Sequence, residues 1–397
     1  MTVWSCNPSR TQFNLPVRPR AAMAQEEGYE FTTFRGSDAG AVASQTRRAP
    51  LTSNQVLISI THSGLCGTDQ HYRKAGCVLG HEGIGVVQSL GPDVRTLRIG
   101  QRVGWGYVHG TCYKCRQCLE GYDQFCSARQ VYGVTNLDQG SMGYAAIWPE
   151  SSLYAIPDKL SSLDAAPMMC AGASIFGIYE QCGIKPNDRV GIIGLGGLGH
   201  MALIFGAKLG LETVVFTHSV AKQVDAIVMG ATEFIPLEDL PRIISARRKR
   251  RDSDSGIDDH ERNSMDDGSE GDAGNICPLD HLIVTTTEDV DWSTFFELMA
   301  PRGTVHLLVG NIKDNLVVPS AALIDSGLRV FGSLVAPRSV MIRMLDFAAR
   351  NRVRPIVQKF PLTAEGVNTA FQKLDEGTIR YRGVLETPMD CLYKASQ

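Results

Sequence analysis

Four cysteines crowd into one short stretch, GTCYKCRQCLEGYDQFC, which runs from Gly110 to Cys126. Disulfides, a redox motif and a metal site are the three kinds of chemistry that could use them. Gaps of two, two and seven residues separate Cys112, Cys115, Cys118 and Cys126. Such short gaps bring four thiolates to about 2.3 Å from one tetrahedral zinc ion at low cost in chain entropy. Two CxxC pairs that share a cysteine do not fit a thioredoxin-type site, so the spacing predicts a closed structural zinc site.

A second set of metal-binding side chains flanks this cluster. Cys66 lies in GLCGTDQH, His81 in LGHEG, and Cys170 in PMMCAGAS at the start of a predicted helix. A catalytic zinc ion needs three protein ligands and one open position. Each residue alone would be read as an ordinary core side chain. Their joint placement around the four-cysteine cluster favours a catalytic zinc site.

Three neighbours of Cys66 have types that would serve such a site. Asp69 could accept the second ring N–H of His81 and fix its tautomer. Thr68 could hydrogen-bond a zinc-bound alcohol and take its proton, and His71 could pass that proton to solvent. We therefore assign Thr68 and His71 as candidate catalytic residues.

A glycine-rich motif, GLGGLG, follows the apolar run RVGII and precedes the helical pattern HMALIFGAKLG. This strand–turn–helix context is the one that a dinucleotide-binding loop requires. Gly194 would make the tight turn, Gly196 would let the backbone approach a pyrophosphate, and Gly199 would allow close helix packing. The candidate cofactor-binding residues here are Gly194, Leu195, Gly196, Gly197, Leu198 and Gly199.

The end of the next predicted strand reads FTHSVAK, without the acid that binds the ribose of NAD. Thr217, His218 and Ser219 stand there instead, followed by Lys222. Hydroxyl groups and a lysine can bind a 2′-phosphate, and no carboxylate at this position repels one. The pattern favours NADP(H) over NAD(H).

Two kinds of sequence pattern are found in the elements that must position these residues. Residues 54–60 read as a strand, and residues 83–105 alternate short apolar runs with Gly, Pro and Asp, which is typical of a small β-barrel. Helical spacing begins near residue 165, and residues 189–219 read as a βαβ unit of a parallel sheet. Further buried strands are expected at 281–287 and 303–310, an amphipathic helix at 339–353, and a final strand at YRGVLE.

Two segments fit neither of these sequence patterns. Residues 247–275 are basic, then acidic, with few apolar side chains, so we expect disorder. We interpret RRKRR within them as part of a solvated charged loop or unspliced sequence, with a nuclear address as the alternative. The first 22 residues contain no acid and three arginines. We interpret them as an unstructured extension before Met23, with a transit peptide as the alternative.

Composition excludes several classes of function. The 397 residues carry a formal charge of −3, which suggests no nucleic-acid partner. No apolar run reaches the roughly 18 residues of a membrane span, and no secretory signal is present. We expect a cytoplasmic protein, with a mitochondrial location as the alternative, in which clustered thiols bind metal rather than form disulfides.

These motifs together resemble the zinc-dependent medium-chain alcohol dehydrogenases, and most closely their cinnamyl alcohol dehydrogenase branch. The resemblance covers residues 29–386 apart from the charged insertion, and RYRGVLE adds to it. It implies a GroES-like β-barrel catalytic domain and a Rossmann domain with a doubly wound parallel sheet, an α/β architecture. It also implies a role for Glu82 beside the catalytic metal, and a homodimer. The expected divisions are an extension at 1–23, the catalytic domain at 24–163, the Rossmann domain at 164–320 with a disordered insertion at about 245–276, and a C-terminal return at 321–397.

The resemblance implies hydride transfer between NADP(H) and a primary alcohol/aldehyde pair, aromatic or aliphatic, with two zinc ions per chain. The segment between His71 and His81 is shorter than in plant members, so the substrate cannot be carried over. A polyol dehydrogenase of the same superfamily is one alternative, although such enzymes use glutamate where Cys170 stands. The others are an inactive relative that keeps zinc or cofactor binding, and a nuclear interaction protein.

Overall fold

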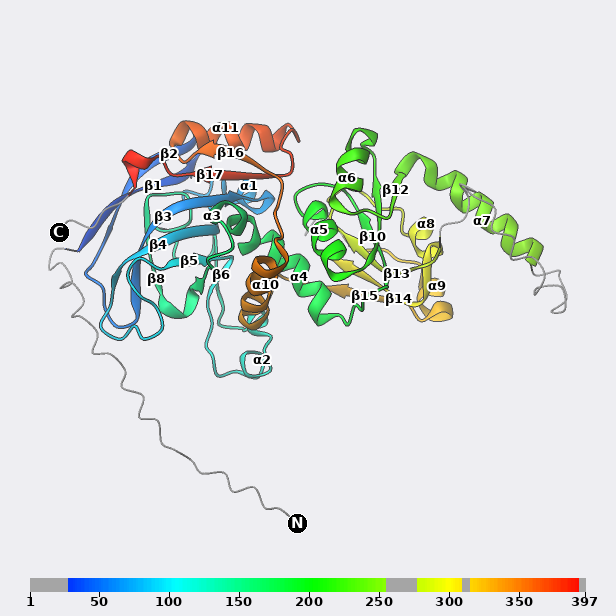
Figure 1. The fold of residues 1–397 in the computed structure, drawn as a ribbon, viewed down its shortest axis with the longest axis horizontal. Helices are drawn as coiled ribbons and strands as arrows, with labels where there is room; N and C mark the ends of the chain where they lie inside the picture. Colours follow the sequence, from blue (N-terminus) through cyan, green and yellow to red (C-terminus); the bar gives the residue numbers. More distant parts are fainter. Residues whose placement is uncertain (1–27, 255–276, 309–314, 393–397) are drawn as a thin grey trace, which may run out of the picture.

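Two sheets organise the computed structural model, which describes residues 28–254, 277–308 and 315–392. Figure 1 shows a barrel half and a parallel-sheet half, with α4 and α10 between them. The fold is thus an α/β architecture of a GroES-like barrel and a Rossmann-type sheet, as predicted. No helix in the described ranges is both long and apolar enough to cross a membrane. Residues 1–27 lie outside the described part, so the predictions for the extension and the compartment stay predictions.

The barrel half is built on a seven-stranded sheet with the order β16-β17-β3-β4-β5-β9, in which β8 also pairs with β3. A β1–β2 hairpin and a β6–β7 pair complete it. Its strands are β1 (Tyr29–Ser37), β2 (Gly40–Arg48), β3 (Gln55–Leu65), β4 (Glu82–Leu90), β5 (Arg102–Trp105), β6 (Val108–Gly110), β7 (Gln130–Val131), β8 (Ala145–Pro149), β9 (Tyr154–Ala155), β16 (Val357–Pro361) and β17 (Arg382–Glu386). Its helices are α1 (Gly67–Tyr72), α2 (Arg116–Leu119), α3 (Ser162–Ala165) and α11 (Ala364–Asp375).

The other half carries six parallel strands in the order β12-β11-β10-β13-β14-β15. Its two central strands are rich in Val, Ile and Leu and have no exposed residues, because helices cover both faces of a parallel sheet. The strands are β10 (Arg189–Ile193), β11 (Glu212–Thr217), β12 (Glu233–Pro236), β13 (Leu279–Val284), β14 (Met299–Leu307) and β15 (Arg329–Gly332). The helices are α5 (Gly199–Leu209), α6 (Gln223–Met229), α7 (Leu240–Asp254), α8 (Trp292–Glu297) and α9 (Ser320–Ser326).

The two linking helices, α4 (Ala171–Gln181) and α10 (Arg338–Asn351), pack on each other. The side chains of α4 are nearly all buried, which suits a helix enclosed by both halves. A core of apolar residues runs from α4 and α10 to α5 and the parallel sheet. The sites at the ends of α4 and α5 are therefore held by one continuous packed interior.

The structure corrects two of the expected boundaries. The Rossmann sheet includes β15, so the return to the barrel begins after Gly332 rather than at residue 321. Helix α7 continues to Asp254, into the segment predicted to be disordered from about residue 245. It buries Leu240, Ile243 and Ile244, and arginine and lysine then prolong a helix that is already nucleated. Residues 255–276 lie outside the described part.

Candidate metal centres and cofactor site

Side chains from three elements converge at the predicted catalytic zinc site. One ligand atom from each of Cys66, His81, Glu82 and Cys170 lies within 4.8 Å of the others. Cys66 precedes α1, His81 and Glu82 stand at the start of β4, and Cys170 precedes α4. The pairing of β3 with β4 and β17 explains this meeting. Gly64 of β3 pairs with Glu82 of β4, and Leu65 of β3, next to Cys66, pairs with Gly383 of β17.

Asp69 fixes the orientation of His81. One of its carboxylate oxygens lies 3.0 Å from His81 Nδ1, and the other accepts the Cys66 backbone N–H at 2.9 Å. The remaining ring nitrogen, His81 Nε2, is buried without a hydrogen-bond partner in the described structure. A buried nitrogen aimed into a group of thiols and left unpartnered fits a metal ligand.

The protonation of the cluster also suits a cation. A hydrogen bond from Cys170 lowers the pKa of Cys66, burial raises it, and His81 lowers it further, leaving it well below the usual value. That hydrogen bond and burial raise the pKa of Cys170. Burial lowers the pKa of His81, but Asp69 and Cys66 raise it well above its usual value. The Cys66 thiolate thus lies between the protons of the Cys170 thiol and the His81 ring, and a zinc ion would displace both protons.

The two candidate relay residues lie on α1, where residues three apart share a face. Thr68 Oγ1 lies 3.6 Å from Cys66 Sγ, beside the cluster. His71 is exposed in the last turn of the helix. The pair therefore leads from the buried cluster to the surface.

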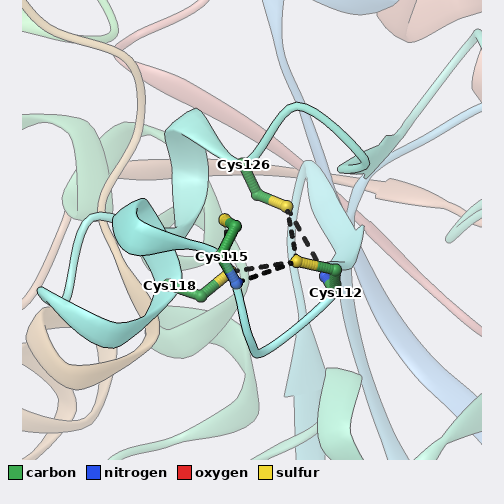
Figure 2. Close-up of side chains that lie close together, drawn as sticks. All are labelled: Cys112, Cys115, Cys118 and Cys126. Atoms are coloured by element: carbon green, nitrogen blue, oxygen red, sulfur yellow. Dashed lines mark hydrogen bonds between the residues drawn. The ribbon is translucent and has the colours of Figure 1, made fainter.

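The four-cysteine stretch folds into a lobe around α2 and a short 3₁₀ turn, Asp123–Phe125. Its sulfur atoms converge (Figure 2), with 3.5 Å between Cys115 and Cys118, 3.6 Å between Cys126 and Cys112, and 4.0 Å between Cys112 and Cys118. These separations are close to the roughly 3.8 Å expected around tetrahedral zinc and far from a disulfide of about 2.05 Å. Backbone N–H groups of Lys114 and Cys115 lower the pKa of Cys112 to about 6, which favours the thiolate that binds zinc.

The glycine turn between β10 and α5 has the backbone expected of a dinucleotide-binding loop. Gly194 adopts a φ of +90°, in the left-handed region that favours glycine. A Cβ at Gly199 would lie 1.9 Å from the Gly194 carbonyl oxygen. A Cβ at Gly196 would meet no atom within 4 Å, so this part of the turn faces open space that a cofactor could fill.

β11 ends at Thr217, and the residues that follow it lead to Lys222 beside this turn. Lys222 Nζ donates to the Leu195 carbonyl oxygen at 2.8 Å. Thr217 is buried and accepts the Ser219 backbone N–H at 3.3 Å. His218 is exposed, and its Nε2 lies 3.5 Å from Glu288 Oε2. The strand thus ends in hydroxyls and an imidazole, with a lysine folded back onto the glycine turn.

Comparisons with known proteins agree with this arrangement. Residues 52–158 match the family model described as alcohol dehydrogenase GroES-like domain. The chain is 29% identical to an alcohol dehydrogenase of Geobacillus stearothermophilus, over 87% of this chain and 95% of that protein. It is also 29% identical to NADP-dependent alcohol dehydrogenase C of Mycobacterium bovis, over 93% of this chain and 98% of that protein. A cinnamyl alcohol dehydrogenase from Sorghum bicolor shares the fold, with a TM-score of 0.78 and 24% identity over 93% of this chain and 99% of that one.

The chain resembles alcohol dehydrogenases along most of its length, and residues 52–158 match their GroES-like domain. It is an alcohol dehydrogenase-type oxidoreductase, and its barrel and parallel sheet share the fold of the solved cinnamyl alcohol dehydrogenase.

Sequence reasoning gave no role to Arg382, which connects the two sites of this alcohol dehydrogenase. Its guanidinium forms a buried ion pair with Glu82, beside the metal cluster. On its other side, a Cβ at Gly197 would lie 3.0 Å from Arg382 Nη1. Burial raises the pKa of Glu82 to about 7, although Arg382 acts to lower it. The motif RYRGVLE was the only signal, because 300 residues separate the two partners.

Proposed function

We propose that this protein is a zinc-dependent enzyme that transfers hydride between NADP(H) and a primary alcohol/aldehyde pair, aromatic or aliphatic. The observation that carries the proposal is the meeting of Cys66, Cys170 and the unpartnered His81 Nε2 in one buried cluster. Arg382 connects this cluster with the glycine turn, so a metal-bound substrate and a nicotinamide would be neighbours.

Cys66, His81 and Cys170 would hold the catalytic zinc, with Glu82 next to them. When bound, zinc would polarise the substrate oxygen as a Lewis acid, and the nicotinamide would accept or supply the hydride. In the oxidation direction, Thr68 takes the proton of the alcohol hydroxyl and His71 passes it to solvent. Asp69 keeps Nε2 of His81 directed at the cluster.

The preference for NADP(H) is supported by the residues after β11. Neither Thr217, His218 nor Ser219 offers a carboxylate to a ribose, and Lys222 lies beside the glycine turn. One relative with 29% identity carries the name NADP-dependent alcohol dehydrogenase C, which agrees with this choice. We also infer that Cys112, Cys115, Cys118 and Cys126 hold a second, structural zinc.

We further infer that the enzyme is a homodimer. Within the described residues β15 has a strand partner on one side only, β14. The side chains of Val330 and Phe331 on this edge are 36% and 42% exposed. Sheet edges with exposed apolar groups favour pairing with another chain.

Zinc content and turnover test the proposed activity together. We expect elemental analysis to give two zinc ions per chain, and NADPH to be oxidised with a panel of aldehydes. Cys66→Ser should lose one zinc and fall to background turnover with the fold retained. Cys277→Ser, which changes an exposed thiol outside both clusters, should keep both zinc ions and full activity.

Normal turnover in Cys66→Ser would rule out the ligand assignment. A wild-type protein with one zinc and no turnover would instead indicate the inactive relative. NADPH binding without turnover would point to the same conclusion, and a zinc-containing enzyme active only on polyols would favour the polyol alternative.

A further inference from the structure

Tyr381 belongs to the barrel half by sequence but is held by the parallel-sheet half. Its hydroxyl donates to Asp225 Oδ2 on α6 at 2.6 Å. Its ring stacks on His200 at the start of α5, with 5.3 Å between centroids and 14° between planes. Tyr381 is buried, so its ring is a fixed surface next to the glycine turn.

Two cations share this ring. Lys222 Nζ lies 5.9 Å from the ring centroid, and the Arg380 guanidinium carbon lies 5.8 Å from it, within the range of cation–π contacts. Lys222 comes from the 3₁₀ turn Val220–Lys222 that follows β11, whereas Arg380 comes from the barrel half just before β17. Burial lowers the pKa of Lys222, and Arg380 lowers it further, as expected of two positive charges that face each other.

The nearby carboxylates are engaged by other groups. Asp225 accepts the Tyr381 hydroxyl, and Glu288 lies 3.5 Å from His218. Within the described ranges no carboxylate pairs with the exposed Arg380. Arg382, two residues further, is already paired with Glu82 and lies against Gly197. Arg380 is therefore the cation of this segment that is free to bind an anion beside Lys222.

We propose that Arg380 is a specificity-determining residue that binds the 2′-phosphate of NADP(H) together with Lys222, one cation from each half of the molecule. The inference rests on the proposed function, because it names a further residue for the same cofactor. A phosphate dianion gains from two charge-assisted contacts, and arginine can make them bidentate. NADP(H) is then bound by residues of both halves.

Binding measurements separate this role from catalysis. NADPH and NADH are titrated by nicotinamide fluorescence, and adenosine 2′,5′-bisphosphate and ADP by calorimetry, in wild type, Arg380→Ala and Lys222→Ala. We expect each variant to weaken the binding of NADPH and the 2′,5′-bisphosphate about five- to twentyfold, with NADH and ADP within about twofold. Arg380→Lys should recover part of the loss.

Arg98→Ala is the matched control, since it removes another exposed arginine of the barrel half. It lies after the end of β4 that is remote from Glu82 and should bind all four ligands as wild type does. Equal losses for NADPH and NADH in Arg380→Ala would assign this arginine to the pyrophosphate and overturn the proposal.

Unchanged binding in Arg380→Ala, with a selective loss in Lys222→Ala, would overturn the second cation but leave the NADP preference standing. If Lys222→Ala weakened NADH as much as NADPH, the NADP preference itself would fail. Thermal unfolding of each variant, expected to match wild type, verifies that the protein remains folded.

Discussion

At the scale of single residues, the candidate catalytic centre depends on a buried carboxylate. Asp69 accepts from the His81 ring and from the Cys66 backbone N–H at the same time. It therefore fixes two residues of the cluster, although it is not among the four that could hold the ion. A buried charge with both oxygens hydrogen-bonded is stable, and it directs Nε2 toward the metal.

We predict that Asp69→Asn weakens binding of the catalytic zinc about ten- to hundredfold, because the amide presents an N–H to one of its two donors. Competition with a chelator, followed by zinc analysis, measures this loss. Asp375→Asn is the control, since Asp375 accepts from Gln70 and Arg73 near the same helix without touching His81. Unaltered zinc retention in Asp69→Asn would show that Asp69 does not position His81.

At the scale of elements, the cysteine lobe has little apolar packing of its own. Leu119, Tyr122 and Phe125 are 75%, 42% and 42% exposed. The lobe nevertheless contacts α10, because Asp123 Oδ1 accepts the Arg338 backbone N–H at 3.1 Å and Arg338 lies over the Tyr113 ring. A structural zinc would thus stabilise both the lobe and the start of a helix that lies between the halves.

We predict that Cys118→Ser lowers the melting temperature by roughly 5–10 °C, because the lobe loses the ion that replaces a hydrophobic core. Differential scanning fluorimetry, with zinc analysis of the same samples, provides the measurement. Cys277→Ser should melt as wild type does. A Cys118→Ser protein that melts at the wild-type temperature would contradict a stabilising metal at this lobe.

Local patterns predicted the parts of this molecule that are short in sequence. The spacing of Cys112 to Cys126 and the strand–turn–helix setting of Gly194 to Gly199 each lie within one element pair, so their geometry follows from the chain itself. Cys170 was predicted as a ligand because cysteine, like Cys66 and His81, is a common zinc-binding residue. Arg382 and Tyr381 could not be placed, because their partners are distant in sequence. The antiparallel pairing of β17 with β3 brings Arg382 to Glu82, whereas Asp225, the partner of Tyr381, lies on α6 of the other half. The prediction of disorder from about residue 245 relied on the many charged residues there. It missed that α7 begins earlier, where buried Ile243 and Ile244 anchor the helix that the charged residues continue.

At the scale of the whole molecule, β15 is an edge strand of the parallel sheet, with no strand beyond it among the described residues. All four residues of β15 are exposed, and Ile324 on α9 is 78% exposed. A twofold axis beside β15 would pair this strand with its copy and bury Val330 and Phe331 of both chains. The result would be one continuous sheet through two subunits.

We predict that wild type behaves in solution as a dimer of the 43.2 kDa chain, and that Phe331→Glu converts it to a monomer. Two carboxylates near the twofold axis would repel each other and would replace the apolar contacts of Phe331. Light scattering after size exclusion gives the mass of each species. Val228→Glu, at a side chain 80% exposed on α6, is the control and should remain dimeric. A dimer that persists unchanged in Phe331→Glu would place the interface elsewhere, because the paired β15 strands could not enclose two adjacent glutamates without dissociating.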